Sequence, residues 1–79
     1  MKELVQFIVT SLVDHPDEVD VAEVETDDGL IIELSVAGSD MGRIIGKGGR
    51  VVNAIRTVVD VAAKQRGISV SLELLEDED

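Results

Sequence analysis

The chain has 79 residues, a formal net charge of −10, no cysteine and one aromatic residue, Phe7. A chain this short buries only about 60% of its unfolded surface, so we expect one domain with a small core. That core should consist of Val, Ile, Leu and Ala, with Phe7 as its only aromatic. The missing cysteines exclude disulfides and thiolate metal sites and fit a reducing cytoplasm, the expected compartment.

The acidity and the hydropathy pattern restrict the partners. No apolar run is long enough to cross a bilayer, so no membrane partner is expected. General nucleic-acid binding is disfavoured, because non-specific affinity comes from neutralising phosphates. Any nucleic acid should therefore bind at a local basic site.

The first predicted element is a helix over residues 3–13, whose apolar side chains recur every three or four positions. Pro16 cannot continue a helix and disfavours helical backbone at the residue before it. We therefore expect the helix to end at His15-Pro16-Asp17, with His15 exposed.

Two strands are predicted next. Residues 19–24 alternate loosely, whereas residues 30–36 alternate apolar and polar side chains throughout. The sequence Asp27-Asp28-Gly29 between them is typical of a hairpin turn.

Two helices and a third strand follow. Gly38-Ser39-Asp40 breaks the second strand, and Ser39 or Asp40 is expected to cap a short helix over residues 40–45. Residues 50–65 have the strongest helical pattern, which Gly67 should stop. Residues 68–74 alternate as a last strand.

Basic residues are segregated in one part of this acidic chain. Positions 41–59 hold no acidic residue, while all 17 carboxylates lie elsewhere. The basic residues of this segment are Arg43, Lys47, Arg50 and Arg56. This segregation predicts that an anionic ligand docks here. Arg56 is also spaced for an i,i+4 pair with Asp60, as Asp60 is with Lys64, which leaves a structural role open for Arg56.

The segment contains the turn Gly46-Lys47-Gly48-Gly49 between two apolar pairs. Glycines permit tight or positive-φ backbone and remove side chains where a ligand must approach closely. The helix that follows presents free N–H groups and a partial positive charge, which suit a phosphate. The spacing fits neither a Walker P-loop nor a dinucleotide-binding fingerprint.

At Ile45-Gly46-Lys47-Gly48-Gly49-Arg50-Val51-Val52 the chain resembles the KH domain. The expected order α-β-β-α-α-β matches the type II arrangement of that fold. Asp14-His15-Pro16 and the segments 40–47 and 54–59 are similar to the KhpA family of small bacterial KH proteins, although Asn53 and Gly48 depart from its usual pattern. The resemblance implies an α+β fold in which three helices cover one face of a three-stranded sheet. The acidic residues 76–79 are expected to form a polar tail.

A KH domain clamps about four nucleotides of single-stranded RNA at its Gly-x-x-Gly loop. The resemblance therefore implies an RNA-binding protein that acts as an RNA chaperone or post-transcriptional regulator and is linked to the cell envelope and cell shape. It also implies a KhpB-type protein partner (also called Jag or EloR), with a homodimer as a further expectation. The predicted RNA-binding residues are Arg43, Ile44, Ile45, Gly46, Lys47, Gly48, Gly49, Arg50, Val51, Val52 and Ile55.

Two alternatives stay open. No aromatic residue lies near the loop to stack on bases, so binding by the isolated chain should be weak. The chain is alternatively an interaction subunit that uses the KH fold as a protein scaffold. Single-stranded DNA is the other ligand that the sequence allows at this loop. With one histidine and no cysteine or tyrosine, the sequence predicts neither an enzyme nor a cofactor.

Overall fold

The computed structural model describes residues 1–75, so the tail expected at 76–79 lies outside the described residues. In that part of the chain, no helix is long and apolar enough to cross a membrane. Short 3₁₀ turns precede β1, α2 and α3. The elements are α1 (Lys2–Thr10), β1 (Asp20–Glu25), β2 (Gly29–Ser35), α2 (Met41–Ile45), α3 (Arg50–Arg66) and β3 (Ser69–Leu74).

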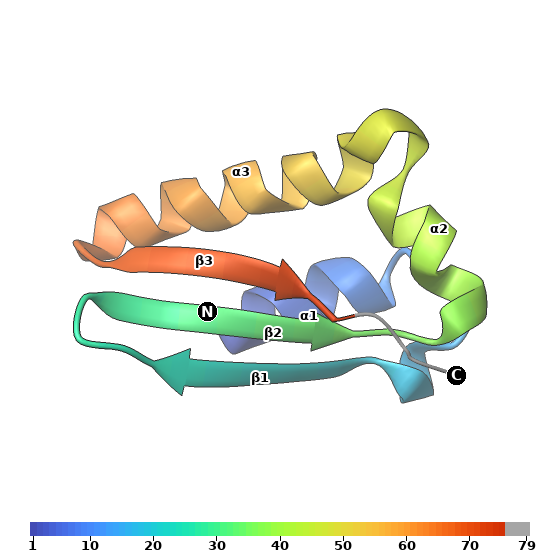
Figure 1. The fold of residues 1–79 in the computed structure, drawn as a ribbon, viewed down its shortest axis with the longest axis horizontal. Helices are drawn as coiled ribbons and strands as arrows, with labels where there is room; N and C mark the ends of the chain where they lie inside the picture. Colours follow the sequence, from blue (N-terminus) through green and yellow to red (C-terminus); the bar gives the residue numbers. More distant parts are fainter. Residues whose placement is uncertain (76–79) are drawn as a thin grey trace.

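The three strands form one mixed sheet with β2 in the centre. β1 pairs antiparallel with β2 through the predicted hairpin, whereas β3 returns parallel to β2. Figure 1 shows α1 behind the sheet, α3 running alongside β3, and α2 at one end. The predicted α+β order and the single helical layer are confirmed.

The core lies between this helical layer and the inner face of the sheet. Val5 and Val9 of α1 pack toward Ile32 and Leu34 of β2, and all four are fully buried. Phe7 was predicted to belong to this core, and that prediction is wrong: Phe7 is 71% exposed. Val5 and Val9 are four residues apart on one face of α1, and Phe7 lies midway between them, on the opposite face.

Helix α1 ends at Thr10, three residues before the predicted end. The Thr10 hydroxyl donates to the Gln6 carbonyl at 2.7 Å, and the Ser11 hydroxyl donates to the Phe7 carbonyl at 2.7 Å. These hydroxyls bind carbonyl groups of the last helical turn, and the Phe7 carbonyl also accepts the Ser11 N–H at 3.2 Å. Pro16 therefore begins a separate 3₁₀ turn instead of ending α1.

Candidate nucleic-acid interface

The turn between α2 and α3 has the backbone that its glycines predict. Gly46, Gly48 and Gly49 have φ angles of 74°, 65° and 80°. A Cβ atom on Gly46 would lie 2.5 Å from Val51 Cγ2 and 2.9 Å from the Val51 nitrogen, so only glycine fits there. A Cβ on Gly48 would meet no atom within 4 Å, which leaves its positive φ as the only steric constraint.

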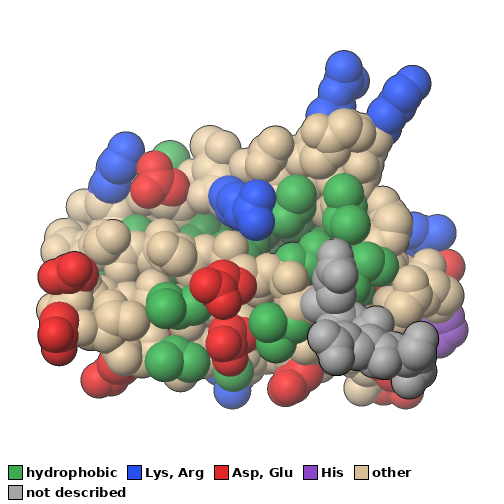
Figure 2. All heavy atoms as spheres, viewed as in Figure 1, with side chains coloured by type: hydrophobic (Ala, Val, Ile, Leu, Met, Phe, Trp, Pro, Cys, Tyr) green, Lys and Arg blue, Asp and Glu red, His purple; other side chains and the backbone are tan. Residues whose placement is uncertain are grey.

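Of the predicted cations, one lies in this turn and one directly follows it, and both face solvent. Lys47 lies within the turn and Arg50 begins α3, and both side chains are exposed. Neither forms an ion pair with another residue in the described range 1–75. Basic side chains project beyond the turn in Figure 2. Among residues 1–75, no side chain caps the first turn of α3, so this end of the helix suits an anion.

Arg43 has a different environment from these two cations. Its guanidinium donates to Asp14 Oδ1 at 2.9 Å and to the Leu12 carbonyl at 3.4 Å. The side chain thus connects α2 to the segment after α1. A phosphate at Arg43 would compete with the Asp14 carboxylate.

The predicted apolar residues differ in how far they are exposed. Ile45 is 37% exposed and borders the turn, where it is accessible to a ligand. Ile44 is fully buried, and Val52 and Ile55 are almost so. In this conformation Ile44 cannot form the apolar surface for bases that we expected of it. Val51 is half-buried and lies on the side of α3 that faces α1.

A groove of about 450 Å³ lies between α3 and β3. Its β3 side comes from Val70, Ser71 and Leu72, which sequence reasoning did not assign to the site. Because β3 is an edge strand, unpaired backbone groups border this groove. The alternation of residues 68–74 indicated a strand, but only the parallel return beside β2 places it next to α3.

Asp40, predicted as an N-cap, makes no capping hydrogen bond to α2. It is 1% exposed, and its carboxylate accepts from the backbone N–H groups of Asp14 at 3.1 Å and His15 at 3.0 Å. His15 Nδ1 lies 3.1 Å from the same carboxylate. The prediction of an Asp40 cap is therefore wrong, because the group turns inward to hold the loop after α1. His15 itself is exposed, as predicted.

These contacts shift both pKa values. The hydrogen bond to Asp40 raises the pKa of His15 above its ordinary value of 6.5, although desolvation opposes the shift. Burial would raise the pKa of Asp40, but the Asp14 N–H and the ring and N–H of His15 together lower it below 3.8. The pair is therefore most stable with His15 protonated and Asp40 ionised.

A second groove, of about 400 Å³, lies between α1 and α3 and is almost wholly apolar. Phe7 of α1 and Val61 of α3 are further exposed apolar side chains outside its lining. The sequence already indicated a second apolar surface, because α1 and α3 each have more apolar residues than one buried face of a helix can hold. The residues that line the groove are Ile8, Leu12, Arg50, Val51, Ala54, Ile55 and Val58.

Comparison with known proteins gives the same family throughout. Residues 2–74 match the family model described as "KhpA/KhpB, KH domain". The RNA-binding protein KhpA of Clostridium acetobutylicum is 49% identical over 75 residues, which cover 95% of this chain and 100% of that protein. The KhpA proteins of Chlamydia caviae and Listeria monocytogenes are each 46% identical, covering 98% and 96% of this chain and 99% and 100% of their own lengths. The chain belongs to the KhpA/KhpB family of KH domains.

Proposed function

We propose that this protein is an RNA-binding protein that holds single-stranded RNA at the turn Gly46–Gly49. The observation that carries the proposal is the pair of exposed cations, Lys47 and Arg50, at an uncapped helix start in a chain of net charge −10. Relatives that match over their whole length are named RNA-binding proteins, which supports the same function.

In this mechanism the sugar-phosphate backbone passes over Gly48 and Gly49, where no side chain blocks it. Lys47 and Arg50 neutralise phosphates, and the N–H groups at the start of α3 donate hydrogen bonds to a phosphate oxygen. Ile45 gives the neighbouring base an apolar contact. Arg43 contributes only if the RNA displaces Asp14 from it.

Affinity should be modest, because stacking on aromatic side chains contributes about 1–3 kcal/mol per base elsewhere and is missing here. The only aromatic residue, Phe7, lies on α1 and not in the turn. Useful affinity therefore needs a second binding module, supplied by a partner or a second copy.

The test is fluorescence anisotropy of a labelled single-stranded RNA of mixed sequence, titrated with wild type and Lys47→Glu at two salt concentrations. The lysine is the better target because Gly48 has a positive φ, so that a substitution there also strains the turn. The matched control is Lys2→Glu, the same change of charge on α1.

We expect salt-dependent binding that Lys47→Glu weakens by at least about tenfold and Lys2→Glu leaves nearly unchanged. Equal loss in both variants would mean that overall charge, and not the turn, governs binding. No binding by wild type would reject the proposal. A DNA strand of the same sequence, run in parallel, tests whether the ligand is RNA.

A second function, protein interaction, is favoured by the apolar groove between α1 and α3. Its walls carry almost no polar surface, and Val58 on its rim is 46% exposed. We propose that a KhpB-type protein covers this groove, because the matching family model describes KhpA and KhpB domains together. The RNA-chaperone role, the cytoplasmic location and the link to cell shape belong to the same proposal.

Co-purification with the KhpB-type protein of the same organism tests this, with and without ribonuclease. We expect the complex to survive RNA digestion and to be lost in Val58→Asp. If the complex forms but Val58→Asp has no effect, the interface lies elsewhere. Sedimentation of the isolated protein shows whether a second copy occupies the groove instead.

A further inference from the structure

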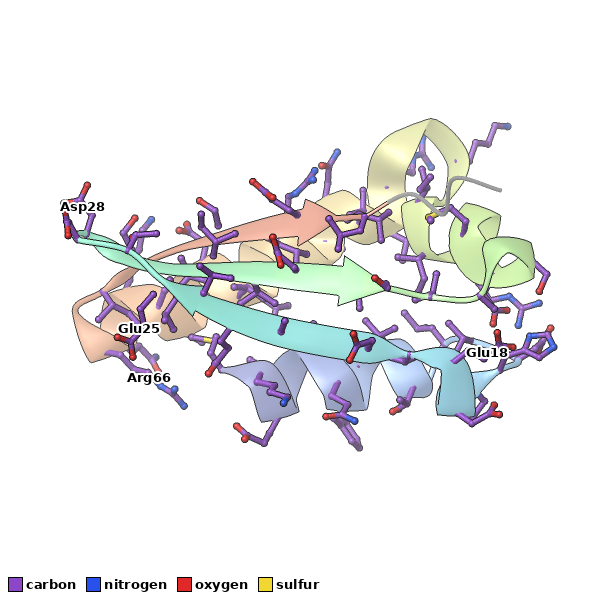
Figure 3. The ribbon with its side chains drawn as sticks, turned by 60° about the horizontal axis from the view of Figure 1, so that its bottom comes forward. Glu18, Glu25, Asp28 and Arg66 are labelled. Carbon is purple, nitrogen blue, oxygen red and sulfur yellow. The ribbon has the colours of Figure 1, made fainter. Side chains whose placement is uncertain are left out.

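Strand β1 is an uncovered edge of the sheet. β2 is the central strand, so β1 lies at the edge opposite to β3. Figure 3 shows β1 along this edge, with Glu18 before its start and Glu25 at its end. Every side chain of β1 except Val21 is exposed. The edge is therefore open to a further strand.

The hydrogen bonds of the hairpin show which backbone groups of β1 are free. The Thr26 N–H donates to the Gly29 carbonyl at 2.9 Å, and bonded and non-bonded residues alternate along an antiparallel pair. Every second residue of β1, counted back from Thr26, therefore bonds to β2, and the residues between point their N–H and C=O groups outward. These outward residues are Val21, Glu23 and Glu25. Within residues 1–75, no other backbone group bonds to them.

The side chains of β1 divide between two faces, because they alternate along a strand. On the face away from the helices, Ala22 and Val24 are exposed, and Val24 pairs with Ile31 of β2. On the helical side, Glu25 is exposed and forms no ion pair within residues 1–75. Glu23 lies 3.7 Å from the N-terminal amine and is 34% exposed. The edge thus offers apolar contacts on one face and carboxylates on the other.

The charge around this edge restricts what can bind there. From residue 3 to residue 42 the chain has no lysine or arginine, although most of its 17 carboxylates lie in that range. The phosphates of RNA would be repelled. A second copy of β1, paired antiparallel about its centre, would place Asp20 opposite Glu25, and like charges directly opposite destabilise a sheet. A strand that carries cations meets neither obstacle.

We propose that the β1 edge binds an extended basic segment of another protein, which adds an antiparallel fourth strand to the sheet. Its lysines or arginines lie opposite Glu23 and Glu25, and its apolar residues continue the face of Ala22 and Val24. The outward backbone groups of β1 bond to the basic residues of the segment, since bonded pairs in an antiparallel ladder lie directly across from each other. Figure 1 places β1 on the side of the molecule away from the Gly46–Gly49 turn, so the segment leaves the proposed RNA site free.

The probe is a labelled peptide, Lys-Val-Lys-Val-Lys-Val, titrated with the protein and followed by fluorescence anisotropy. A peptide of the same composition, Lys-Lys-Lys-Val-Val-Val, keeps the charge and loses the alternation, and we expect it to bind at least about tenfold more weakly. N-methylation of the lysine nitrogens removes the donors that face β1 and should weaken binding by at least about tenfold. The matched control carries the methyl groups on the valine nitrogens, which point away from β1, and should bind like the unmodified peptide.

The protein variant is Glu25→Lys, which puts a cation opposite the cations of the peptide. It should weaken binding by about three- to tenfold. The matched control is Glu73→Lys, the same change at an exposed position on the opposite edge strand, and it should have little effect. In wild type, saturating peptide should slow hydrogen exchange at the outward N–H groups of β1. Urea unfolding of each variant confirms that it is folded.

Several results would overturn the inference. Equal binding of the alternating and block peptides, or equal weakening by Glu25→Lys and Glu73→Lys, would reduce the interaction to general charge attraction. Equal effects of the two methylations, or unchanged exchange at the outward N–H groups, would exclude strand addition. Failure of wild type to bind the alternating peptide would also overturn it. The proposed RNA binding is tested separately by Lys47→Glu and does not depend on any of these outcomes.

Discussion

Asp40 Oδ2 lies 3.1 Å from His15 Nδ1, and this contact joins the segment after α1 to the residue that precedes α2. The Asp40 carboxylate also accepts two backbone N–H groups, so one buried side chain fixes the path of that segment. Helix α2 leads directly into the Gly46–Gly49 turn. The position of the proposed RNA-binding turn therefore depends on a carboxylate outside it.

The first prediction concerns Asp40→Asn. The amide presents one acceptor and one donor where the structure needs acceptors for three N–H groups, so one donor is left unpaired. We expect a melting temperature lower by several degrees and weaker RNA binding. Ser39→Ala is the control, since the one side-chain contact of Ser39 within residues 1–75 is a marginal 3.5 Å to His15. An unchanged melting temperature in Asp40→Asn would show that the carboxylate is dispensable.

The second prediction concerns pH. The raised pKa of His15 means that its contribution to stability is complete below pH 6.5 and is lost as pH rises through the higher folded pKa. The lowered pKa of Asp40 means that its contribution is present above pH 3.8 and is lost as pH falls through the lower folded pKa.

Urea midpoints should therefore decline as pH rises from about 6.5 to 8, the window above the ordinary histidine pKa. His15→Gln should remove most of that decline, because His15 is the only histidine of the chain. A decline of the same size in the variant would assign the pH dependence to other groups.

The third prediction concerns Gly46→Ala. A methyl group there would meet Val51 at 2.5 Å and requires a positive φ, so the turn must rearrange. RNA binding should be lost, and stability should fall by at least about 1 kcal/mol. Gly42→Ala in α2 is the matched control: its Cβ meets no atom within 4 Å, and its φ is not positive. Normal binding by Gly46→Ala would mean that the observed turn is not required.

The fourth prediction tests whether Ile44 contributes to the stability of the core or to contact with RNA. Because Ile44 is fully buried, Ile44→Val should lower the free energy of unfolding by about 0.5–1.5 kcal/mol without changing RNA affinity. Ile45→Val, at an exposed neighbour, should do the reverse, with a small loss of affinity and little loss of stability. A direct effect of Ile44→Val on affinity, in protein that is fully folded, would restore Ile44 to the RNA-binding surface.

The element order and the position of the turn were predictable from the sequence, because hydrophobic period and glycine placement are local signals. The exposure of Phe7 was not predicted. A helix that packs against the sheet on one side buries the apolar residues of that side alone, and apolar residues on its other side are buried only if another surface covers them. The fate of Asp40 was also beyond local reasoning. A side chain next to a helix start can cap that helix, and only the tertiary position of Asp14 and His15 directs it elsewhere.

Gly29 of β2 pairs with Ser69 of β3, some forty residues later, and the proposed RNA-binding turn lies within that crossover. Closing a loop of this length costs more conformational entropy than closing the short turn of the β1–β2 hairpin. We therefore expect the hairpin to form early during folding and the turn to acquire its fixed position only after β3 has docked. We expect a chain in which Ser69–Leu74 has not yet paired with β2 to lack the fixed turn and to bind RNA more weakly than the folded protein.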